Sequence, residues 1–283
     1  MVRKVKGVNV GIGIPKIAVP ITGASDREIM DQLNRLDLKK IDLVEWRADF
    51  YKKVGFIENT LNILEEVNKK AEGKPIIFTL RTESEGGQLE ISLQDYIKTN
   101  KKVSESGLVD VIDIQAFFPS KEESNDKNKE LKFKKINTEE LRNPSKDKNK
   151  YKSQKEIQEL IKTIKSHGLE VIASYHNFSE TPGEEEIEEI LAELNRVGSI
   201  IKFASMAGSP EDVFRLRGSI EKSRSFIRKP IIGISMGEIG KISRITQDSA
   251  KSCISYAGLK GEVAPGQLSL GELYEILNYS GVE

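Results

Sequence analysis

The feature that most constrains the fold is a repeated alternation of short apolar segments with segments that have a helical pattern. Apart from one long insertion, the apolar segments recur roughly every 25 to 35 residues, and there are eight of them. Such alternation is typical of parallel strands joined by crossover helices. Eight units in 283 residues predict a closed (β/α)8 barrel, the TIM barrel, rather than a doubly wound sheet. The strands are expected at residues 16–22, 42–49, 75–82, 109–118, 170–178, 199–207, 230–236 and 253–257.

We expect residues 1–283 to form this single barrel domain, with two additions. Residues 2–15 contain three glycine breakers and predict a short N-terminal hairpin or arm. Residues 120–153 are rich in Lys, Glu and Asn and poor in apolar residues, which predicts a flexible insertion without a catalytic role. No strand is followed by a strong G-x-G-x-x-G pattern, which argues against a dinucleotide-binding fold.

Capping residues predict where several helices begin. Ser25 is expected to cap the first helix, and Ser209, followed by Pro210, is expected to start the helix after the sixth strand. Thr181, with a proline after it and Glu184 three residues on, is expected to cap the helix after the fifth strand by the same logic.

Composition excludes several classes of function. Lys plus Arg and Asp plus Glu both number 44, so no net charge favours nucleic acid or an anionic membrane as a partner. No apolar run is long enough for a membrane span or a signal peptide, and we expect a soluble cytoplasmic protein. The single cysteine, Cys253, excludes a disulfide framework. There are only two histidines, His167 and His176, so no metal site is expected.

A lysine lies in the middle of the sixth predicted strand, SIIKFASMA. Alternation along a strand places Lys202 on the same face as Ile200 and Ala204. Its amine either reaches back to water along an apolar surface or is desolvated and able to form a Schiff base with a ketone. This segment alone favours the first reading, so the choice depends on the partners of Lys202.

Other polar residues fall at the carboxyl ends of the predicted strands, where barrel enzymes carry their active sites. A lysine, a histidine and several arginines at one barrel mouth suit a small ketone that bears a carboxylate. The lysine would form an iminium, the histidine would move protons, and an arginine would hold the carboxylate. The residues at these strand ends are Glu45, Arg47, Arg81, Gln115, His176 and Lys202.

Six motifs in order resemble those of the type I 3-dehydroquinate dehydratases of the shikimate pathway. The resemblance covers nearly the whole chain outside the insertion. It implies a (β/α)8 barrel that converts 3-dehydroquinate to 3-dehydroshikimate through a Schiff base, without metal or cofactor, in a protein that is commonly a homodimer. The motifs are VEWRAD, FTLRTESEGG, ASYHNFSETP, IIKFASMA, GISMGEIGKISR and EVAPGQLS.

The resemblance also implies a role for each matched residue. Lys202 matches the Schiff-base lysine, His176 the general acid–base histidine, and Glu85 the carboxylate that pairs with that histidine. Val263 to Gln267 corresponds to a loop expected to close over the substrate. The positions that match substrate-binding residues are Glu45, Arg47, Arg81, Arg244 and Gln267.

Three positions depart from the family pattern. Pro20 and Val263 stand where many members carry serines, and Gln115 stands where an acidic residue is common. Two alternative functions remain open: a Schiff-base aldolase on the same kind of barrel, and a barrel that binds without catalysis. The aldolase is disfavoured because no clear phosphate-binding loop follows the last two strands.

Overall fold

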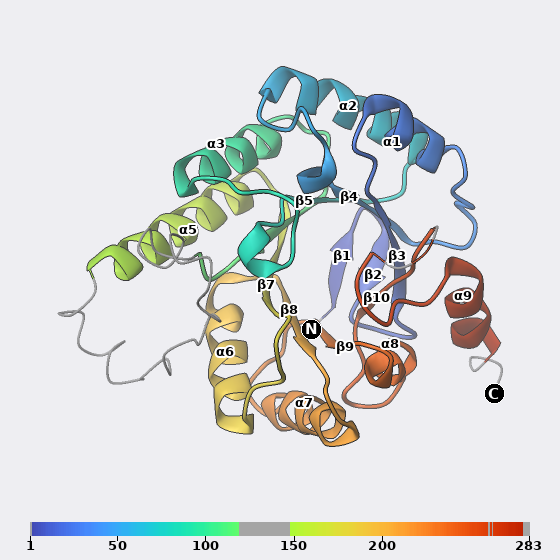
Figure 1. Ribbon diagram of the computed structural model, residues 1–283, viewed down its shortest axis with the longest axis vertical. Helices are drawn as coiled ribbons and strands as arrows, with labels where there is room; N and C mark the ends of the chain where they lie inside the picture. Colours follow the sequence, from blue (N-terminus) through green and yellow to red (C-terminus); the bar gives the residue numbers. More distant parts are fainter. Residues whose placement is uncertain (1, 119–147, 260, 262, 280–283) are drawn as a thin grey trace.

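The main body of the protein is a near-closed barrel of eight parallel strands surrounded by helices, as predicted (Figure 1). The computed structural model describes residues 2–118, 148–259, 261 and 263–279. The strand order is β10-β3-β4-β5-β6-β7-β8-β9, and every pairing between neighbours is parallel. The two end strands meet through Cys253, whose N–H donates to the Ile231 carbonyl at 2.8 Å. The strands are β3 (Lys16–Ile21), β4 (Leu43–Arg47), β5 (Ile76–Thr79), β6 (Val111–Gln115), β7 (Glu170–Asn177), β8 (Ile200–Met206), β9 (Ile231–Met236) and β10 (Ile254–Tyr256).

The α-helices between the strands pack their apolar faces on the outside of the barrel, where buried residues such as Trp46, Phe78 and Ile112 meet them. The α-helices are α1 (Asp26–Leu33), α2 (Ile57–Lys70), α3 (Leu93–Ser104), α5 (Lys148–Ser166), α6 (Glu184–Val197), α7 (Pro210–Ser223), α8 (Ile242–Ile245) and α9 (Leu270–Tyr279). In the described part of the chain, three short 3-10 helices lie in the loops: η1 (Ala48–Phe50), η2 (Glu83–Glu85) and η3 (Ile239–Lys241). No helix in the described ranges is long and apolar enough to cross a membrane.

The lumen of the barrel is apolar at the amino ends of the strands. Large aliphatic side chains from different strands form one buried cluster there, and the N-terminal hairpin of β1 (Arg3–Val5) and β2 (Val8–Val10) adds Val5 and Val10 to it. The predicted hairpin therefore closes this end of the barrel. Each fully buried aliphatic side chain contributes roughly 1.5–3 kcal/mol by leaving water. The strand residues of this cluster include Leu43, Ile77, Val111, Ile172, Ile200, Ile232 and Ile254.

Two predicted helix starts are correct and one is wrong. The Ser25 side chain accepts the Glu28 N–H, and Ser209 forms a capping box with Asp212. Thr181 does not cap α6, because Gly183 occupies the N-cap position instead. The Thr181 hydroxyl donates to the Met206 carbonyl at 2.7 Å, so it ties the loop after β7 to the end of β8.

The predicted insertion extends too far at its carboxyl end. The backbone is already helical at Lys148, where α5 begins, so residues 148–153 belong to this helix rather than to a loop. Residues 120–147, the remainder of the predicted insertion, lie outside the described residues.

Candidate active site

A layer of polar side chains lies above the apolar cluster, toward the carboxyl ends of the strands. Alternation along each strand produces this layer, because residues two positions beyond the apolar ones point into the same lumen. Asp113 follows Val111 on β6, Ser174 follows Ile172 on β7, and Lys202 follows Ile200 on β8. Ser174 and Lys202 are register partners on adjacent strands. Three neighbouring strands therefore bring a carboxylate, a hydroxyl and an amine together.

Lys202 is buried in this layer, with 6% of its surface exposed. Its Nζ lies 3.1 Å from Asp113 Oδ2 and 4.6 Å from the centre of the Tyr256 ring, which it faces in a cation–π contact. The amine therefore does not reach back to water, so the first of the two alternatives considered for Lys202 is ruled out. The ion pair and the ring hold Nζ at a fixed position in the lumen.

Asp113 is the centre of the buried hydrogen-bond network. Its Oδ1 accepts from Arg81 Nη2 at 2.7 Å and from the Ser174 hydroxyl at 2.6 Å, while its Oδ2 faces Lys202. Burial alone would raise the pKa of Asp113, but the positive charges of Arg81 and Lys202 outweigh it and lower this pKa to about 2. The carboxylate therefore stays ionised and balances the two buried cations.

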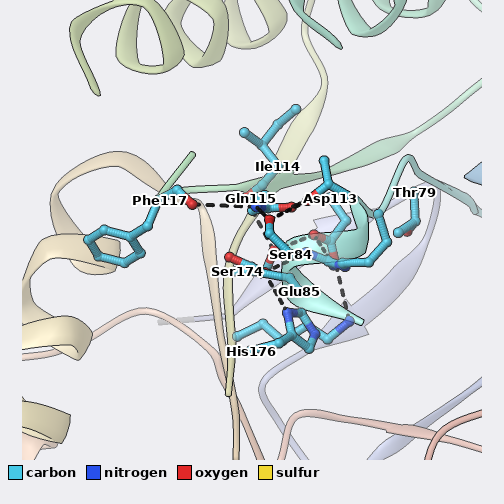
Figure 2. Close-up of polar contacts among 12 residues, drawn as sticks. Thr79, Ser84, Glu85, Asp113, Ile114, Gln115, Phe117, Ser174 and His176 are labelled. Carbon is cyan, nitrogen blue, oxygen red and sulfur yellow. Dashed lines mark hydrogen bonds and ion pairs between the residues drawn. The ribbon is translucent and has the colours of Figure 1, made fainter. Parts of the chain in front are cut away.

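His176 is positioned by Glu85, as Figure 2 shows. Its Nδ1 lies 2.9 Å from Glu85 Oε2, and the same oxygen accepts from Arg81 Nη1 at 3.1 Å. Because Oε2 already acts as an acceptor, this arrangement favours Nδ1 as the donor and leaves the lone pair on Nε2. Burial, together with the nearby charges of Arg81 and Lys202, lowers the pKa of His176 well below 6.5. The imidazole is thus neutral at neutral pH and able to accept a proton.

The short helix η2 places Glu85 beneath the histidine. Gly86 ends this helix with a φ of 77°, a left-handed conformation that favours glycine. A Cβ on Gly86 would lie 2.2 Å from the ring of Phe178, which stacks on His176 at a centroid distance of 6.5 Å. Gly86 therefore leaves room for the Phe178 ring, which lies against the imidazole. Burial raises the pKa of Glu85, whereas the adjacent positive charge of Arg81 opposes that rise and favours the carboxylate.

The structure brings all eight predicted site residues to the wall of one cavity at the carboxyl ends of the strands. The space in this cavity that the centre of a water molecule can reach is about 60 Å³. The eight are Glu45, Arg47, Arg81, Glu85, His176, Lys202, Arg244 and Gln267.

The predicted substrate-binding residues are held by local contacts. Glu45 accepts from the Thr79 hydroxyl at 2.8 Å, and Arg47 makes two hydrogen bonds of 2.8 Å to Asp49. Arg81 differs, because its guanidinium is shared among Glu85, Asp113 and Ser174 and so connects the network.

Two further predicted residues come from the segments after β9 and β10. Arg244 Nη2 donates to the Pro265 carbonyl at 3.1 Å, and Gln267 Oε1 accepts the Val263 N–H at 2.8 Å. The N–H of Gly237, at the end of β9, also donates to the Pro265 carbonyl. This loop therefore packs onto the barrel mouth and carries Gln267 to the cavity.

Sequence reasoning missed the partners of the lysine. Asp113 was visible as a charged residue inside an apolar strand, but nothing in the sequence indicated which cation it would meet. Tyr256 lies in a weak strand and gave no such signal. Gln115 is buried but does not line the cavity; its Oε1 accepts from the Thr82 hydroxyl at 2.7 Å. Although Gln115 is not acidic, Asp113 supplies an acidic partner for Lys202.

The fold and the cavity define a class: a barrel protein with a buried amine and a neutral imidazole at the mouth of the barrel, an arrangement suited to acid–base chemistry on a carbonyl compound. In the described part of the chain, no three side chains of His, Cys, Asp or Glu are placed to hold a metal ion.

Comparisons with known proteins specify the family. The family model for type I 3-dehydroquinase matches residues 17–143 and 147–283. The 3-dehydroquinate dehydratases of Clostridium kluyveri and Clostridium novyi are 32% and 33% identical over 276 residues, with 97% of this chain and 95% and 96% of theirs covered. The chain therefore belongs to the type I 3-dehydroquinase family, and the predicted resemblance is confirmed.

Solved structures agree with this assignment. A type I 3-dehydroquinate dehydratase from Clostridium difficile, solved with covalently modified comenic acid, has a TM-score of 0.84 and 29% identity, covering 99% of this chain and 98% of that one. The 3-dehydroquinate dehydratase from Enterococcus faecalis has a TM-score of 0.77 and 27% identity, covering 97% and 98%.

Proposed function

We propose that this chain dehydrates 3-dehydroquinate to 3-dehydroshikimate through a Schiff base on Lys202, with His176 as the general acid and base. The dehydration itself follows from membership of the type I 3-dehydroquinase family, which makes the chain a lyase of the shikimate pathway. The covalent route and the residue roles are the proposal.

The observation that carries the proposal is the pairing of two unlike groups at one cavity. Lys202 presents a primary amine that is held by Asp113, and His176 presents Nε2 while Glu85 occupies its Nδ1. A ketone that bonds to the amine would be activated as an iminium, and the carbon next to it would then be the acidic position. Both groups line the same small cavity, so that carbon can meet the imidazole.

In the proposed chemistry, the substrate is first bonded to Lys202 as an iminium and then loses water with the help of His176. The Lys202 ammonium first gives up one proton to water, and the free amine attacks the ketone carbon; the carbinolamine then loses water to give the iminium. His176 Nε2 then removes a proton from the adjacent carbon, and the electron pair moves toward the iminium nitrogen to give an enamine. The protonated His176 returns that proton to the departing hydroxyl, which leaves as water, and hydrolysis of the product iminium releases Lys202.

Charge at the cavity supports the choice of an anionic substrate. Arg47 and Arg244 line the cavity with Lys202, and arginine is well suited to hold a carboxylate. The carboxylate of 3-dehydroquinate is proposed to bind Arg244. Pro20 and Val263, which replace serines of many relatives, line the same cavity, so recognition of the substrate hydroxyls is expected to depend on the other polar residues.

A direct dehydration assay on 3-dehydroquinate tests this proposal. The assay follows formation of the conjugated product by its absorbance, and the matched control is Lys222→Ala, which removes a lysine on the surface of α7. We expect Lys202→Ala to lose turnover by on the order of 10⁴-fold or more, as for other lost covalent nucleophiles, while Lys222→Ala retains it. Turnover by Lys202→Ala near the wild-type rate would remove the covalent role.

We also propose an oligomeric state and a cellular location for this protein. A homodimer is proposed from the family resemblance, and exposed apolar side chains at Phe214 on α7 and Ile242 on α8 offer surface for such a contact. Sedimentation velocity at micromolar concentration would show a single species of twice the chain mass, and a monomer would contradict it. Cytoplasmic location is proposed because the relatives are biosynthetic enzymes.

A further inference from the structure

A second cavity lies at the opposite end of the barrel from the candidate active site. It is formed where the chain enters β3, β9 and β10, at the amino ends of these strands. It encloses about 480 Å³, which is within the range of small-molecule binding sites. Its lining includes Arg224, Lys229, Asp248, Lys251 and Cys253.

The charge on this lining is strongly unbalanced. Arg224 and Lys251 contribute cations, and neither has a carboxylate within 4.0 Å among the described residues. Asp248, which supplies the acidic group of the lining, is already paired with Arg217 of α7. The cavity therefore carries an excess of positive charge that its own walls do not neutralise.

Backbone carbonyls of the lining hold the Arg224 and Lys251 cations in place, whereas the ammonium of Lys229 is turned toward α6. Arg224 Nη1 donates to the Lys229 carbonyl at 3.1 Å, and Lys251 Nζ donates to the Gly13 carbonyl at 2.9 Å. Lys229 Nζ donates to the Asn195 carbonyl. A carbonyl orients a cation without cancelling its charge, so the contacts of Arg224 and Lys251 preorganise donors that an anion can use.

The pKa values of two of these basic groups lie below their ordinary values. Burial lowers the pKa of Arg224. Burial, together with the positive charges of Lys165 and Arg3, lowers the pKa of Lys229. The shift of Arg224 shows that burial disfavours its charged form, and an anion bound in the cavity would favour that form.

The cavity also lies where the barrel is joined most weakly. β9 and β10 are the two end strands of the sheet, and Cys253 N–H to the Ile231 carbonyl and Gly233 N–H to Ser252 Oγ are bonds that join their segments. A ligand that contacts Arg224, which lies between α7 and β9, and Lys251, before β10, would bridge this junction. Binding there is therefore expected to stabilise the fold as well as to neutralise charge.

We propose that this basal cavity is a binding site for a small organic anion that carries two or more carboxylate or phosphate groups, separate from the candidate active site. The cations fit either kind of group, so the test uses one probe of each chemistry, citrate and inorganic pyrophosphate.

Titration calorimetry and the unfolding temperature of the full-length protein test the proposal, with sodium chloride at matched ionic strength as the reference. We expect one equivalent of at least one probe to bind and to raise the unfolding temperature. Arg224→Gln and Lys251→Gln should each weaken binding about tenfold, a change worth about 1.4 kcal/mol. Arg27→Gln, the same charge change on the exposed surface of α1, should leave it unchanged.

A second comparison separates the two cavities, because the candidate active site is also cationic. Arg244→Gln should leave binding of the probe intact, and Arg224→Lys should restore most of the affinity lost in Arg224→Gln. Binding that disappears in Arg244→Gln but persists in Arg224→Gln would place the anion at the active site and overturn the proposal. An effect no greater than that of sodium chloride, for both probes, would overturn it as well.

Discussion

The two ends of the barrel lumen are built from the same strands but filled in opposite ways. At the amino ends, Ile172 and Ile200 pack in a dry aliphatic cluster that the N-terminal hairpin closes. Two residues further along the same strands, Ser174 and Lys202 join a buried network of charged and polar side chains. The contrast shows that the aliphatic end can stabilise the barrel while the charged end carries the cost of desolvation, which only mutual pairing offsets.

The largest expected effect comes from breaking the charged end at its centre. Asp113→Asn keeps the size of the side chain but leaves Arg81 and Lys202 short of negative charge, so the free energy of unfolding should fall by about 3–5 kcal/mol. Urea denaturation measures this. The control is Asp110→Asn just before the same strand, where Oδ2 accepts the Ile76 N–H at 2.9 Å and where we expect a loss of about 1 kcal/mol. Equal losses would mean that the two ends do not differ in this way.

The next effect should appear in turnover rather than in stability. His176→Ala should lower the rate of dehydration by on the order of 10²-fold or more, because the substrate carbon loses its base, while Lys202 can still bond to the ketone. The chain supplies its own control in His167, which is exposed near the C-terminus of α5. His167→Ala should be indistinguishable from the wild type, and a His176→Ala variant that behaves the same way would refute the assigned role.

The pH dependence of turnover should reflect the dry environment of the charged end. Because burial and neighbouring cations lower the pKa of His176 well below 6.5, its imidazole stays neutral as the pH falls to that value. The acidic limb of kcat/KM, at about tenfold per pH unit, should therefore begin clearly below pH 6.5. A limb centred at or above pH 6.5 would show that the histidine is not held in this way.

The smallest effect should come from the aliphatic end. Ile200→Val removes one methyl group from the layer directly below Lys202, and should cost about 0.5–1.5 kcal/mol of unfolding free energy. Turnover at a temperature where the variant is folded should be unchanged, since no polar contact is altered. A large loss of kcat would mean that packing at this end controls the position of the amine.

The sequence predicted the barrel well because each strand carries its own periodicity. The alternation that placed Lys202 with Ile200 and Ala204 is local to one segment, and the same rule puts Glu45 and Arg47 on one face of β4, which in the structure lines the cavity. Family motifs then pointed to Glu85, Arg244 and Gln267, which lie in the short helices η2 and α8 and in the loop after β10, where no periodic signal is present.

What the sequence could not predict depends on contacts between segments. The pairing of Asp113 with Lys202 follows from the register of three adjacent strands, and that register is not encoded in any one of them. Thr181 fits an N-cap pattern, yet Gly183 caps α6 because the Thr181 hydroxyl finds a partner at the end of β8. Local sequence patterns thus predicted which face of a strand a side chain occupies, while tertiary contacts determined which residue it pairs with.

The central claim is that the Lys202 amine bonds covalently to the substrate ketone. Reduction with borohydride during turnover of 3-dehydroquinate, followed by peptide mass spectrometry, tests it most directly. We predict one stable adduct, located on Lys202, in the wild type and in His176→Ala, and none in Lys202→Ala. An unmodified Lys202 under conditions where product forms, or an adduct on a different lysine, would contradict the account.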